Sequence, residues 1–145
     1  FGRYATGFVF APHLAALEAP EPDFVSVAEL CLNAPYLWGG KTSFGLDCSG
    51  LTQLALAAAG IASPRDSDML EREIGEPVSF DDSLSGLRRG DLVFWKGHVG
   101  IMSDPDTLLH ATAYSMTVMS EPLRTARDRI QAKSFGAITS IRRIR

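Results

Sequence analysis

The stretch Asp47-Cys48-Ser49-Gly50-Leu51 decides the fold, because a glycine-bearing turn passes into a helix there. Apolar residues follow Cys48 at the spacing of one helix face, at Leu51, Leu54, Ala55 and Ala58. Asp47 is a favoured N-cap residue, so the pattern predicts a helix that begins at Cys48 and ends near Gly60. A helix N-terminus favours an anion, so we expect the Cys48 thiol, with a reference pKa of about 8.5, to ionise more easily.

The second cysteine, Cys31, fits a different pattern. It shares helical spacing with Phe24, Val27 and Ala28 and has no base or polar loop near it in sequence, so we predict that it is a core residue. Most unpaired cysteines are small buried hydrophobes, and this alternative applies to Cys48 as well. A disulfide between the two cysteines stays open, although two cysteines are not typical of a disulfide-dense secreted domain.

The candidate bases for a reactive thiol are the three histidines of the chain, His13, His98 and His110. Residues 91–103 and 107–118 are rich in strand-forming side chains and flank a turn sequence, which predicts an antiparallel hairpin. With the turn centred on Asp104, His98 lies opposite His110, and paired Cβ atoms are about 5 Å apart. A one-residue change in register would send one imidazole to the opposite face of the sheet.

Cys48, His98 and His110 together would provide a nucleophile, a base and a residue that orients the base, as in acyl-transfer enzymes. The second imidazole would hold the first in the useful tautomer by a hydrogen bond. Taken singly, each histidine could instead be a hydrogen-bonded strand residue. A zinc site built from these residues and Cys31 is the other chemistry available, but the sequence has no close ligand pair, so we predict no metal and no other cofactor.

The length and composition fit one globular domain of ordinary size. The 145 residues are 46% hydrophobic and 21% charged, which is typical of a protein with a core. The net charge is −3 and the basic residues cluster only in the short segment Arg142–Arg145, so we expect no nucleic-acid partner. The sequence has no apolar run long enough to span a bilayer, so we expect no membrane span.

Periodicity and turn residues predict an α+β chain in which helices pack on a central antiparallel sheet. Helices are expected over about residues 24–32, 48–60, 66–74 and 120–131. Asp66 is a candidate N-cap of the third, and Ser120-Glu121-Pro122 fits the start of the fourth. Residues 91–95 are expected to form a central strand buried on both faces, and residues 137–144 a closing strand.

Five short motifs resemble those of the NlpC/P60 cysteine peptidases, papain-like enzymes that cut cell-wall peptides. In chain order they are Pro35–Gly40, Leu46–Leu51, Arg89–Trp95, His98–Met102 and Leu109–Ala111. The resemblance spans about residues 24–145, and the combination is far more specific than any one motif. It implies a papain-like NlpC/P60 fold with the nucleophile at a helix N-terminus.

The resemblance also implies roles for individual residues. Cys48 would be the nucleophile, His98 the general base and His110 the residue that orients His98. Tyr36 matches a tyrosine whose hydroxyl helps to hold the oxyanion, although on sequence alone it could equally be an aromatic packing residue. Four further residues match the pocket for the free amino end of the substrate, Asp47, Ser49, Asp66 and Ser67. Carboxylates and hydroxyl oxygens suit a cationic ammonium, but the same residue types also serve as helix caps and turn residues.

The implied organisation has three parts. Residues 1–17 resemble the tail of a bacterial SH3-like domain, residues 18–23 read as a proline-rich acidic linker, and residues 24–145 would be the catalytic domain. An SH3-like domain would then precede this one in the full-length chain as a partner. The localisation is open between the bacterial cytoplasm and the cell envelope, because any signal peptide would lie upstream of Phe1.

The implied activity is hydrolysis of the γ-D-glutamyl–diamino acid bond of peptidoglycan peptides through an acyl-enzyme. Two alternatives stay open. An amidase or acyltransferase would use the same thiol on another amide or on a lipid, although the polar residues Asp47, Asp66 and Ser67 do not suit a lipid pocket. A non-catalytic wall-binding module would keep the fold without turnover, although such proteins usually lose the nucleophile or the base.

Overall fold

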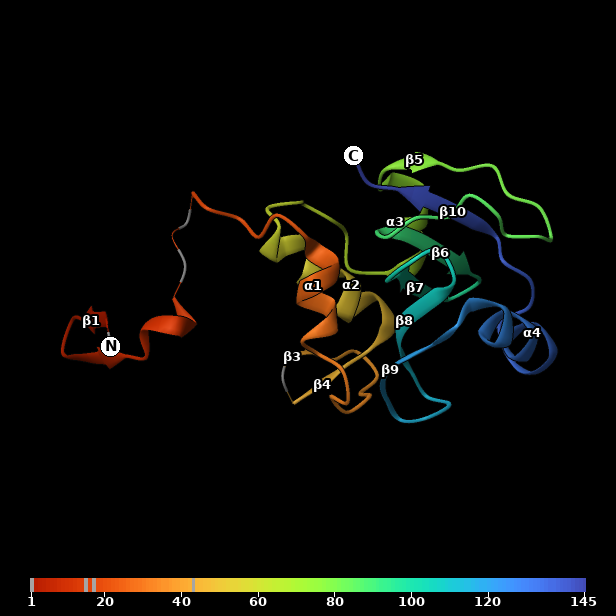
Figure 1. Cartoon of the computed structure of the whole chain (residues 1–145). Helices are drawn as coiled ribbons and strands as arrows, with labels where there is room; N and C mark the ends of the chain where they lie inside the picture. The colour runs from red at the N-terminus through yellow and green to blue at the C-terminus, as the bar shows by residue number, and fades with distance from the viewer. Residues whose placement is uncertain (1, 15, 17, 43) are drawn as a thin grey trace.

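A six-stranded antiparallel sheet forms the centre of this computed structural model, which describes residues 2–14, 16, 18–42 and 44–145 (Figure 1). The strands lie in the order β5-β10-β6-β7-β8-β9. Their bounds are β5 Glu76–Pro77, β6 Asp91–Trp95, β7 His98–Met102, β8 Thr107–Thr112, β9 Thr117–Pro122 and β10 Ser140–Arg143. The predicted α+β class with a central antiparallel sheet is therefore confirmed.

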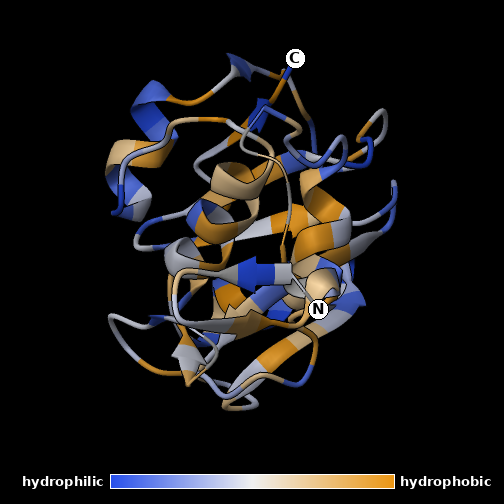
Figure 2. Ribbon diagram, turned by 90° about the vertical axis from the view of Figure 1, so that its left-hand side faces the viewer, coloured by the Kyte–Doolittle hydropathy of each residue, from blue (hydrophilic) through white to orange (hydrophobic). Residues whose placement is uncertain are grey.

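Helices cover both faces of this sheet. The helices α1 (Phe24–Glu29), α2 (Cys48–Ala58) and α3 (Ser67–Glu73) share one apolar cluster with Leu92 and Phe94 of β6. On the opposite face, α4 (Leu123–Lys133) packs in a second cluster with Val93 and Trp95. Figure 2 shows mostly apolar residues in the interior of the fold and hydrophilic residues on the outer loops. All five residues of β6 are buried, as predicted for a central strand, because alternate side chains enter the two clusters.

Helix α2 begins and ends where the sequence predicts. The Asp47 side chain accepts a hydrogen bond from the Gly50 backbone N–H at 2.6 Å, and Gly60 has a φ of +73° beyond the last turn. The predicted buried face was wrong in detail, because Leu54 is exposed. The residues that face the core are Leu51, Thr52, Ala55 and Leu56, since the helix is rotated so that this side meets β7 and β8.

Each of the two predicted strand segments consists of two strands, so the prediction of a single hairpin was wrong. Gly97, with a φ of +89°, makes the turn between β6 and β7. Residues 113–116 turn the chain between β8 and β9, which pair from Thr107↔Pro122 to Thr112↔Thr117. The result is a four-stranded meander in which β7 and β8 occupy the middle.

The register of β7 on β8 also differs from the prediction. Ile101 pairs with Leu109 and Met102 with Leu108, so His110 lies across from Gly100 rather than from His98. The prediction was wrong by two residues because the turn between the strands is centred on Pro105 rather than on Asp104. Since two residues are one full period of a strand, both histidines still share one face of the sheet.

Two predicted helix boundaries and one predicted helix cap need correction. Helix α1 ends at Glu29, so Cys31 lies in the following turn, partly buried against the core, with its thiol 3.7 Å from the Val27 carbonyl oxygen. Residues 120–122 belong to β9, and α4 begins only at Leu123. Asp66 stands at the N-cap position of α3, but within the described residues its side chain accepts no capping hydrogen bond. Both cysteines are free thiols in the described structure.

The N-terminal segment forms a small hairpin of its own, β1 (Gly2–Tyr4) with β2 (Gly7–Val9). Figure 1 shows it at the end of an extended stretch, away from the six-stranded sheet. Strand β2 ends at Val9, and residues 11–13 form a 3-10 helix. Phe1, Ala15 and Leu17 lie outside the described residues. The proposed boundaries at residues 17 and 23 remain predictions.

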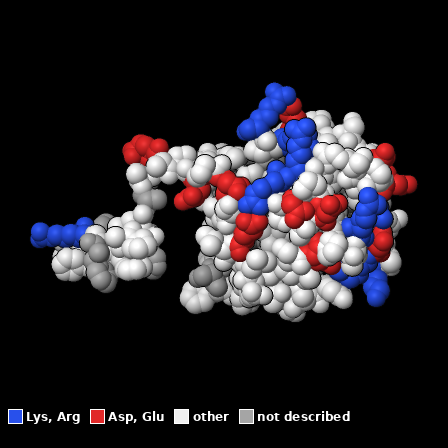
Figure 3. All heavy atoms as spheres, viewed as in Figure 1, with Lys and Arg blue, Asp and Glu red and all other residues white. Residues whose placement is uncertain are grey.

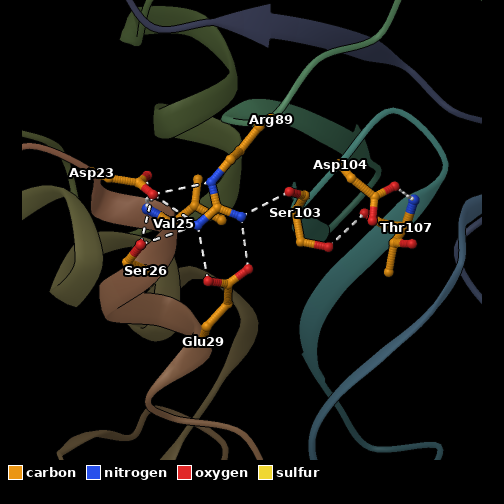
Figure 4. Close-up of polar contacts among 8 residues, drawn as sticks. All are labelled: Asp23, Val25, Ser26, Glu29, Arg89, Ser103, Asp104 and Thr107. Atoms are coloured by element: carbon orange, nitrogen blue, oxygen red, sulfur yellow. Dashed lines mark hydrogen bonds and ion pairs between the residues drawn. The ribbon is translucent and has the colours of Figure 1, made fainter.

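The N-terminus of α1 is joined to the sheet by one arginine, as Figure 4 shows. The Arg89 guanidinium donates to the Asp23 carboxylate at 2.7 Å, to both oxygens of Glu29, and to the Ser103 carbonyl oxygen at 2.8 Å. Asp23 is also the N-cap of α1, since it accepts from the Val25 N–H at 3.0 Å. Arg89 thus connects the first helix with the end of β7.

Charged side chains are unevenly spread over the face in Figure 3. They gather on the upper and right-hand parts of the main body, whereas its lower part, where β3 (Lys41–Thr42), β4 (Gly45–Leu46) and the β8–β9 turn lie in Figure 1, is mostly uncharged. Large exposed apolar side chains come from this end, Leu37, Trp38, Phe44, Tyr114 and Met116. None of the helices in the described part of the chain has the length and hydropathy of a membrane-spanning segment.

Replacing Arg89 with Met should lower the free energy of unfolding by about 1 kcal/mol, because several partly exposed hydrogen bonds to carboxylates are lost together. Urea denaturation at neutral pH measures this loss. The matched control is Arg72→Met, which breaks an exposed pair with Asp68 within α3 and should cost only about 0.3 kcal/mol. Equal losses in the two variants would contradict the connecting role of Arg89.

Candidate functional site

Cys48 is the first residue of α2, and glycines allow its turn to lie directly against the preceding loop. A Cβ atom on Gly50 would collide with the carbonyl oxygen of Gly40. That oxygen accepts a hydrogen bond from the Asp47 backbone N–H at 3.0 Å. Backbone packs on backbone here, which fixes the position of Cys48 relative to the loop.

The Asp47 carboxylate holds this arrangement together. Beside the cap to Gly50, its second oxygen accepts from the Gly39 backbone N–H at 2.8 Å and from the Arg65 guanidinium at 2.7 Å. Burial by itself would raise the pKa of this carboxyl, but Arg65 and the two backbone N–H groups lower it below its usual range. Asp47 is therefore an ionised group whose oxygens already have partners.

The Cys48 thiol is more buried than its place at a helix N-terminus suggested, with 9% of the residue exposed. Burial raises the pKa of the thiol, although backbone N–H groups, foremost that of Val99, act in the opposite direction. The expectation of a thiol that ionises easily was therefore wrong, because the cost of burying a thiolate exceeds the effect of the helix N-terminus. The sulfur lies beside the start of β7, where His98 precedes Val99.

His98 and His110 form a buried pair. The Nε2 atom of His98 lies 2.8 Å from the Nδ1 atom of His110, and the ring centroids are 5.1 Å apart. Gly100, between them on the same face, leaves the room for this contact, because a Cβ atom there would lie 2.6 Å from the Leu108 side chain and 3.3 Å from the His110 Cβ. The sequence correctly predicted a shared face and missed the diagonal register.

Glu121 and Arg129 continue the chain of contacts behind His110. The Nε2 atom of His110 lies 2.8 Å from the Oε1 atom of Glu121, and Arg129 donates to both oxygens of that carboxylate. Burial alone would raise the pKa of Glu121, but the hydrogen bonds from Arg129 and His110 lower it to about 2. The carboxylate is therefore ionised at neutral pH.

Aromatic rings enclose the His98 imidazole. The Phe135 ring stacks on it with a centroid distance of 5.2 Å and an interplanar angle of 2°, and the Trp95 ring lies 5.6 Å away. His98 is 4% exposed, and burial, followed by electrostatic interactions with the neighbouring His110 and Arg129 side chains, lowers its pKa to about 3. The imidazole is therefore neutral at neutral pH and can accept a proton from a thiol.

Two hollows meet at Cys48. The histidine hollow, of about 270 Å³, is lined by Cys48 and His98 together with Tyr36, Trp38, Gly97, Thr112, Ala113, Tyr114, Arg129, Ile130, Lys133, Ser134 and Phe135. The aspartate hollow is lined by Cys48 with Tyr36, Trp38, Gly39, Asp47, Ser49, Arg65, Asp66, Ser67 and Gly97. Because the two share Cys48, Tyr36, Trp38 and Gly97, they are neighbouring parts of one surface depression with the thiol in the middle.

The structure brings the predicted site residues together. Tyr36 lines both hollows, and the four residues predicted to hold an amino end all line the aspartate hollow, Asp47, Ser49, Asp66 and Ser67. His110 is fully buried behind His98. The side chain of His13 is not among those described. Within residues 2–14, 16, 18–42 and 44–145, no group of three or more His, Cys, Asp or Glu side chains is placed to hold a metal ion.

Sequence reasoning missed four residues of the site, Arg65, Glu121, Arg129 and Phe135. Arg65 had a usable signal, because it directly precedes the predicted pair Asp66-Ser67, and it donates to the Ser49 hydroxyl at 2.7 Å as well as to Asp47. Glu121 and Arg129 lie 11 and 19 positions after His110 and meet it only because β9 pairs with β8 and α4 folds back on the sheet. Phe135 carried no signal beyond its apolar character.

Residues 33–134 match the model of the NlpC/P60 family. Dipeptidyl-peptidase 6 from Lysinibacillus sphaericus is 32% identical over 102 residues, which cover 70% of this chain and 36% of the relative. The gamma-D-glutamyl-L-lysine dipeptidyl-peptidase from Bacillus cereus is 32% identical over 111 residues, which cover 71% of this chain and 32% of the relative. The chain thus spans about a third of the length of these relatives.

Solved structures show the same fold. The peptidoglycan hydrolase RipB from Mycobacterium tuberculosis superposes with a TM-score of 0.67 and 27% sequence identity. The alignment covers 83% of this chain and 62% of RipB.

The buried neutral His98 makes stability depend on pH. Its pKa is about 3 in the folded chain, against about 6.5 in an unfolded one, so below pH 6.5 only the unfolded chain binds the proton. Stability should therefore fall as the pH drops from about 6.5 toward 3, by at most about 1.4 kcal/mol per pH unit from this group. Urea denaturation between pH 7 and pH 5, above the range in which carboxylates titrate, measures the slope. In His98→Gln this slope should be shallower, and an unchanged slope would contradict the buried neutral imidazole.

Proposed function

Because this chain belongs to the NlpC/P60 family, we propose that it is a cysteine peptidase that hydrolyses the γ-D-glutamyl–diamino acid bond of peptidoglycan peptides. The observation that carries this proposal is a thiol and an imidazole that line one surface hollow, with a second imidazole hydrogen-bonded behind the first. The similarity to a gamma-D-glutamyl-L-lysine dipeptidyl-peptidase supports the choice of bond, and the similarity to a peptidoglycan hydrolase supports the choice of polymer.

In this mechanism Cys48 is the nucleophile and His98 the general base. The Sγ atom attacks the carbonyl carbon of the substrate while its proton passes to the Nδ1 atom of His98, the ring nitrogen that does not face His110. The imidazolium then donates this proton to the leaving amine, and the C–N bond breaks to give a thioester. Water, deprotonated by His98, hydrolyses the thioester, and the proton returns to Cys48. His110 keeps the His98 ring in place throughout.

The oxyanion would be held by the backbone N–H of Cys48 and the hydroxyl of Tyr36. A helix N-terminus presents backbone N–H groups without an intrahelical partner, which suits a developing negative charge. Tyr36 lines both hollows beside Cys48, and burial together with the nearby Cys48 and Asp47 raises the pKa of its hydroxyl. The hydroxyl therefore stays protonated and can donate a hydrogen bond.

The aspartate hollow would receive the free amino end of the peptide. Asp47 and Ser49 already bind Arg65 at 2.7 Å each, so their part is to shape the hollow. Asp66 and Ser67, at the start of α3, line the same hollow and would provide the acceptors for the ammonium group. Recognition in this form favours peptides whose amino end is free.

A second function is favoured by one observation. The histidine hollow is lined largely by aromatic and apolar side chains such as Trp38, Tyr114, Ile130 and Phe135, which also suits an acyl group. An amidase or acyltransferase would use the same thiol and the same base. Assays with muropeptides beside lipid esters separate the two functions, and we expect turnover with the muropeptides.

Cys48→Ala should abolish hydrolysis of a tetrapeptide such as L-Ala-γ-D-Glu-diaminopimelate-D-Ala, because the variant has no nucleophile. Chromatography and mass spectrometry of the products measure the rate and the bond cleaved. The matched control is Cys31→Ala, since Cys31 lies outside both hollows and its removal should leave the rate nearly unchanged. Cleavage by Cys48→Ala at the wild-type rate would refute the mechanism.

The free tetrapeptide should be cleaved faster than the same peptide with an acetylated amino end, because acetylation removes the positively charged ammonium group that the Asp66 carboxylate would bind. In Asp66→Asn the value of kcat/KM for the free peptide should fall by about tenfold, while that for the acetylated peptide changes little. Asp68→Asn, which removes an exposed carboxylate of the same helix, is the control. Equal rates for both peptides in the wild type would argue against this recognition mode.

A further inference from the structure

We propose that Glu121 and Arg129 are positioning residues that set the direction of the hydrogen bonds through His110 to His98, and thereby leave the Nδ1 atom of His98 free to accept a proton from Cys48. This inference rests on the proposed function for its kinetic consequence. The hydrogen-bond direction itself is a property of the folded chain, whatever the substrate.

The contacts farthest from the thiol are those between Arg129 and Glu121. Arg129 donates to both carboxylate oxygens of Glu121, at 2.5 Å from Nη1 to Oε2. A guanidinium stays charged and can only donate, so a carboxylate paired with it in this fork stays ionised and can only accept. Both side chains are largely buried, at 14% exposure for Arg129 and 8% for Glu121, so little water competes for these contacts.

His110 must follow the direction that Glu121 imposes. Because Oε1 of Glu121 can only accept, the Nε2 atom of His110, 2.8 Å away, must carry its hydrogen. In a neutral imidazole the other nitrogen is then an acceptor, so Nδ1 of His110 presents a lone pair. His110 is fully buried, and no solvent is available to reverse this tautomer.

The tautomer of His110 also fixes the direction of its hydrogen bond with His98. Its Nε2 atom lies 2.8 Å from the Nδ1 atom of His110 and must therefore donate. Neutral His98 then has no hydrogen on Nδ1, which is the nitrogen left for Cys48. The stacked ring of Phe135 packs against the imidazole in this orientation.

Without Arg129 the opposite direction becomes available. A protonated Glu121 could donate to His110, His110 could donate to His98, and the hydrogen of His98 would then lie on Nδ1. In that tautomer His98 cannot accept a proton from the thiol at Nδ1. The Arg129 fork excludes this alternative, and the Tyr114 ring, whose centroid lies 4.0 Å from the Arg129 Cζ atom, packs against the guanidinium.

The test reads the tautomers directly. Proton–nitrogen NMR spectra of the chain labelled with ¹⁵N-histidine, recorded at pH 7, distinguish Nδ1–H from Nε2–H rings. In the wild type, His98 and His110 should both carry hydrogen on Nε2. In Glu121→Gln, whose amide can donate or accept, and in Arg129→Met, the His98 signals should shift toward the Nδ1–H form. Arg129→Lys keeps the positive charge and should retain the wild-type tautomer.

Two rate measurements accompany the spectra. Alkylation of Cys48 by iodoacetamide, followed by peptide mapping to separate it from Cys31, should slow in Glu121→Gln and Arg129→Met. With the tetrapeptide, kcat should fall on the order of 100-fold in these variants while KM changes little, because the base rather than substrate binding is impaired. The matched control is Arg143→Met, which breaks another pair of arginine–carboxylate hydrogen bonds, from Nε and Nη2 to the buried Asp91, away from the hollows, and should leave the His98 tautomer and kcat unchanged.

A wild-type His98 with hydrogen on Nδ1 would overturn the proposal, and so would an unchanged His98 tautomer in both Glu121→Gln and Arg129→Met. An equal fall of kcat in Arg143→Met would assign the effect to folding stability and would also overturn it. If Arg129→Met does not fold, Glu121→Gln, which keeps the side-chain shape, decides. Failure of the wild type to cleave the tetrapeptide would count against the proposed function alone, because the spectra and the alkylation rates need no substrate.

Discussion

The contact between the first turn of α2 and the Gly39–Gly40 loop is the constraint on which the site depends. The Asp47 carboxylate joins the two by accepting from the backbone N–H groups of Gly50 and Gly39, and Arg65 completes its set of partners. A Cβ atom at Gly50 would collide with the carbonyl oxygen of Gly40 and force the two backbones apart, and one at Gly40 would collide with the carbonyl oxygen of Gly45. Because Cys48 lies directly between these anchors, the position of the thiol follows from backbone packing and one carboxylate, and both hollows take their shape around it.

Burial decides the charge state of the candidate pair. A helix N-terminus lowers the pKa of a thiol, but burial of Cys48 acts in the opposite direction and is the larger effect. Burial likewise keeps the His98 imidazole neutral. A neutral thiol beside a neutral imidazole cannot rely on a preformed thiolate, so the proposed reaction needs proton transfer to His98 during attack. The protonation pattern of His98 then matters more than its pKa, because only one of its nitrogens can receive the proton.

The sequence predicted what is local and missed what depends on tertiary contacts. The helix after Asp47, the buried strand at residues 91–95 and the shared face of His98 and His110 follow from spacing and caps, and each was found. The register was wrong because the turn residues Asp104-Pro105-Asp106 do not fix which residue lies at the centre of the turn. Glu121 was assigned to a helix because Pro122 fits a helix start, yet strand β9 extends through Pro122. Its contact with His110 therefore had no local signal.

Arg65 changes the interpretation of the aspartate hollow. A carboxylate that already accepts from a guanidinium at 2.7 Å gains less from a ligand ammonium than a free one does, because the two cations would compete and repel. Asp47 is therefore better suited to hold the loop and the helix start together than to bind the peptide. Asp66, which neither caps α3 nor has an ion-pair partner among the described residues, is the carboxylate in this hollow that is available to a cationic end. In the proposed function, the roles of the two aspartates would then differ because only Asp47 has an ion-pair partner among the described residues.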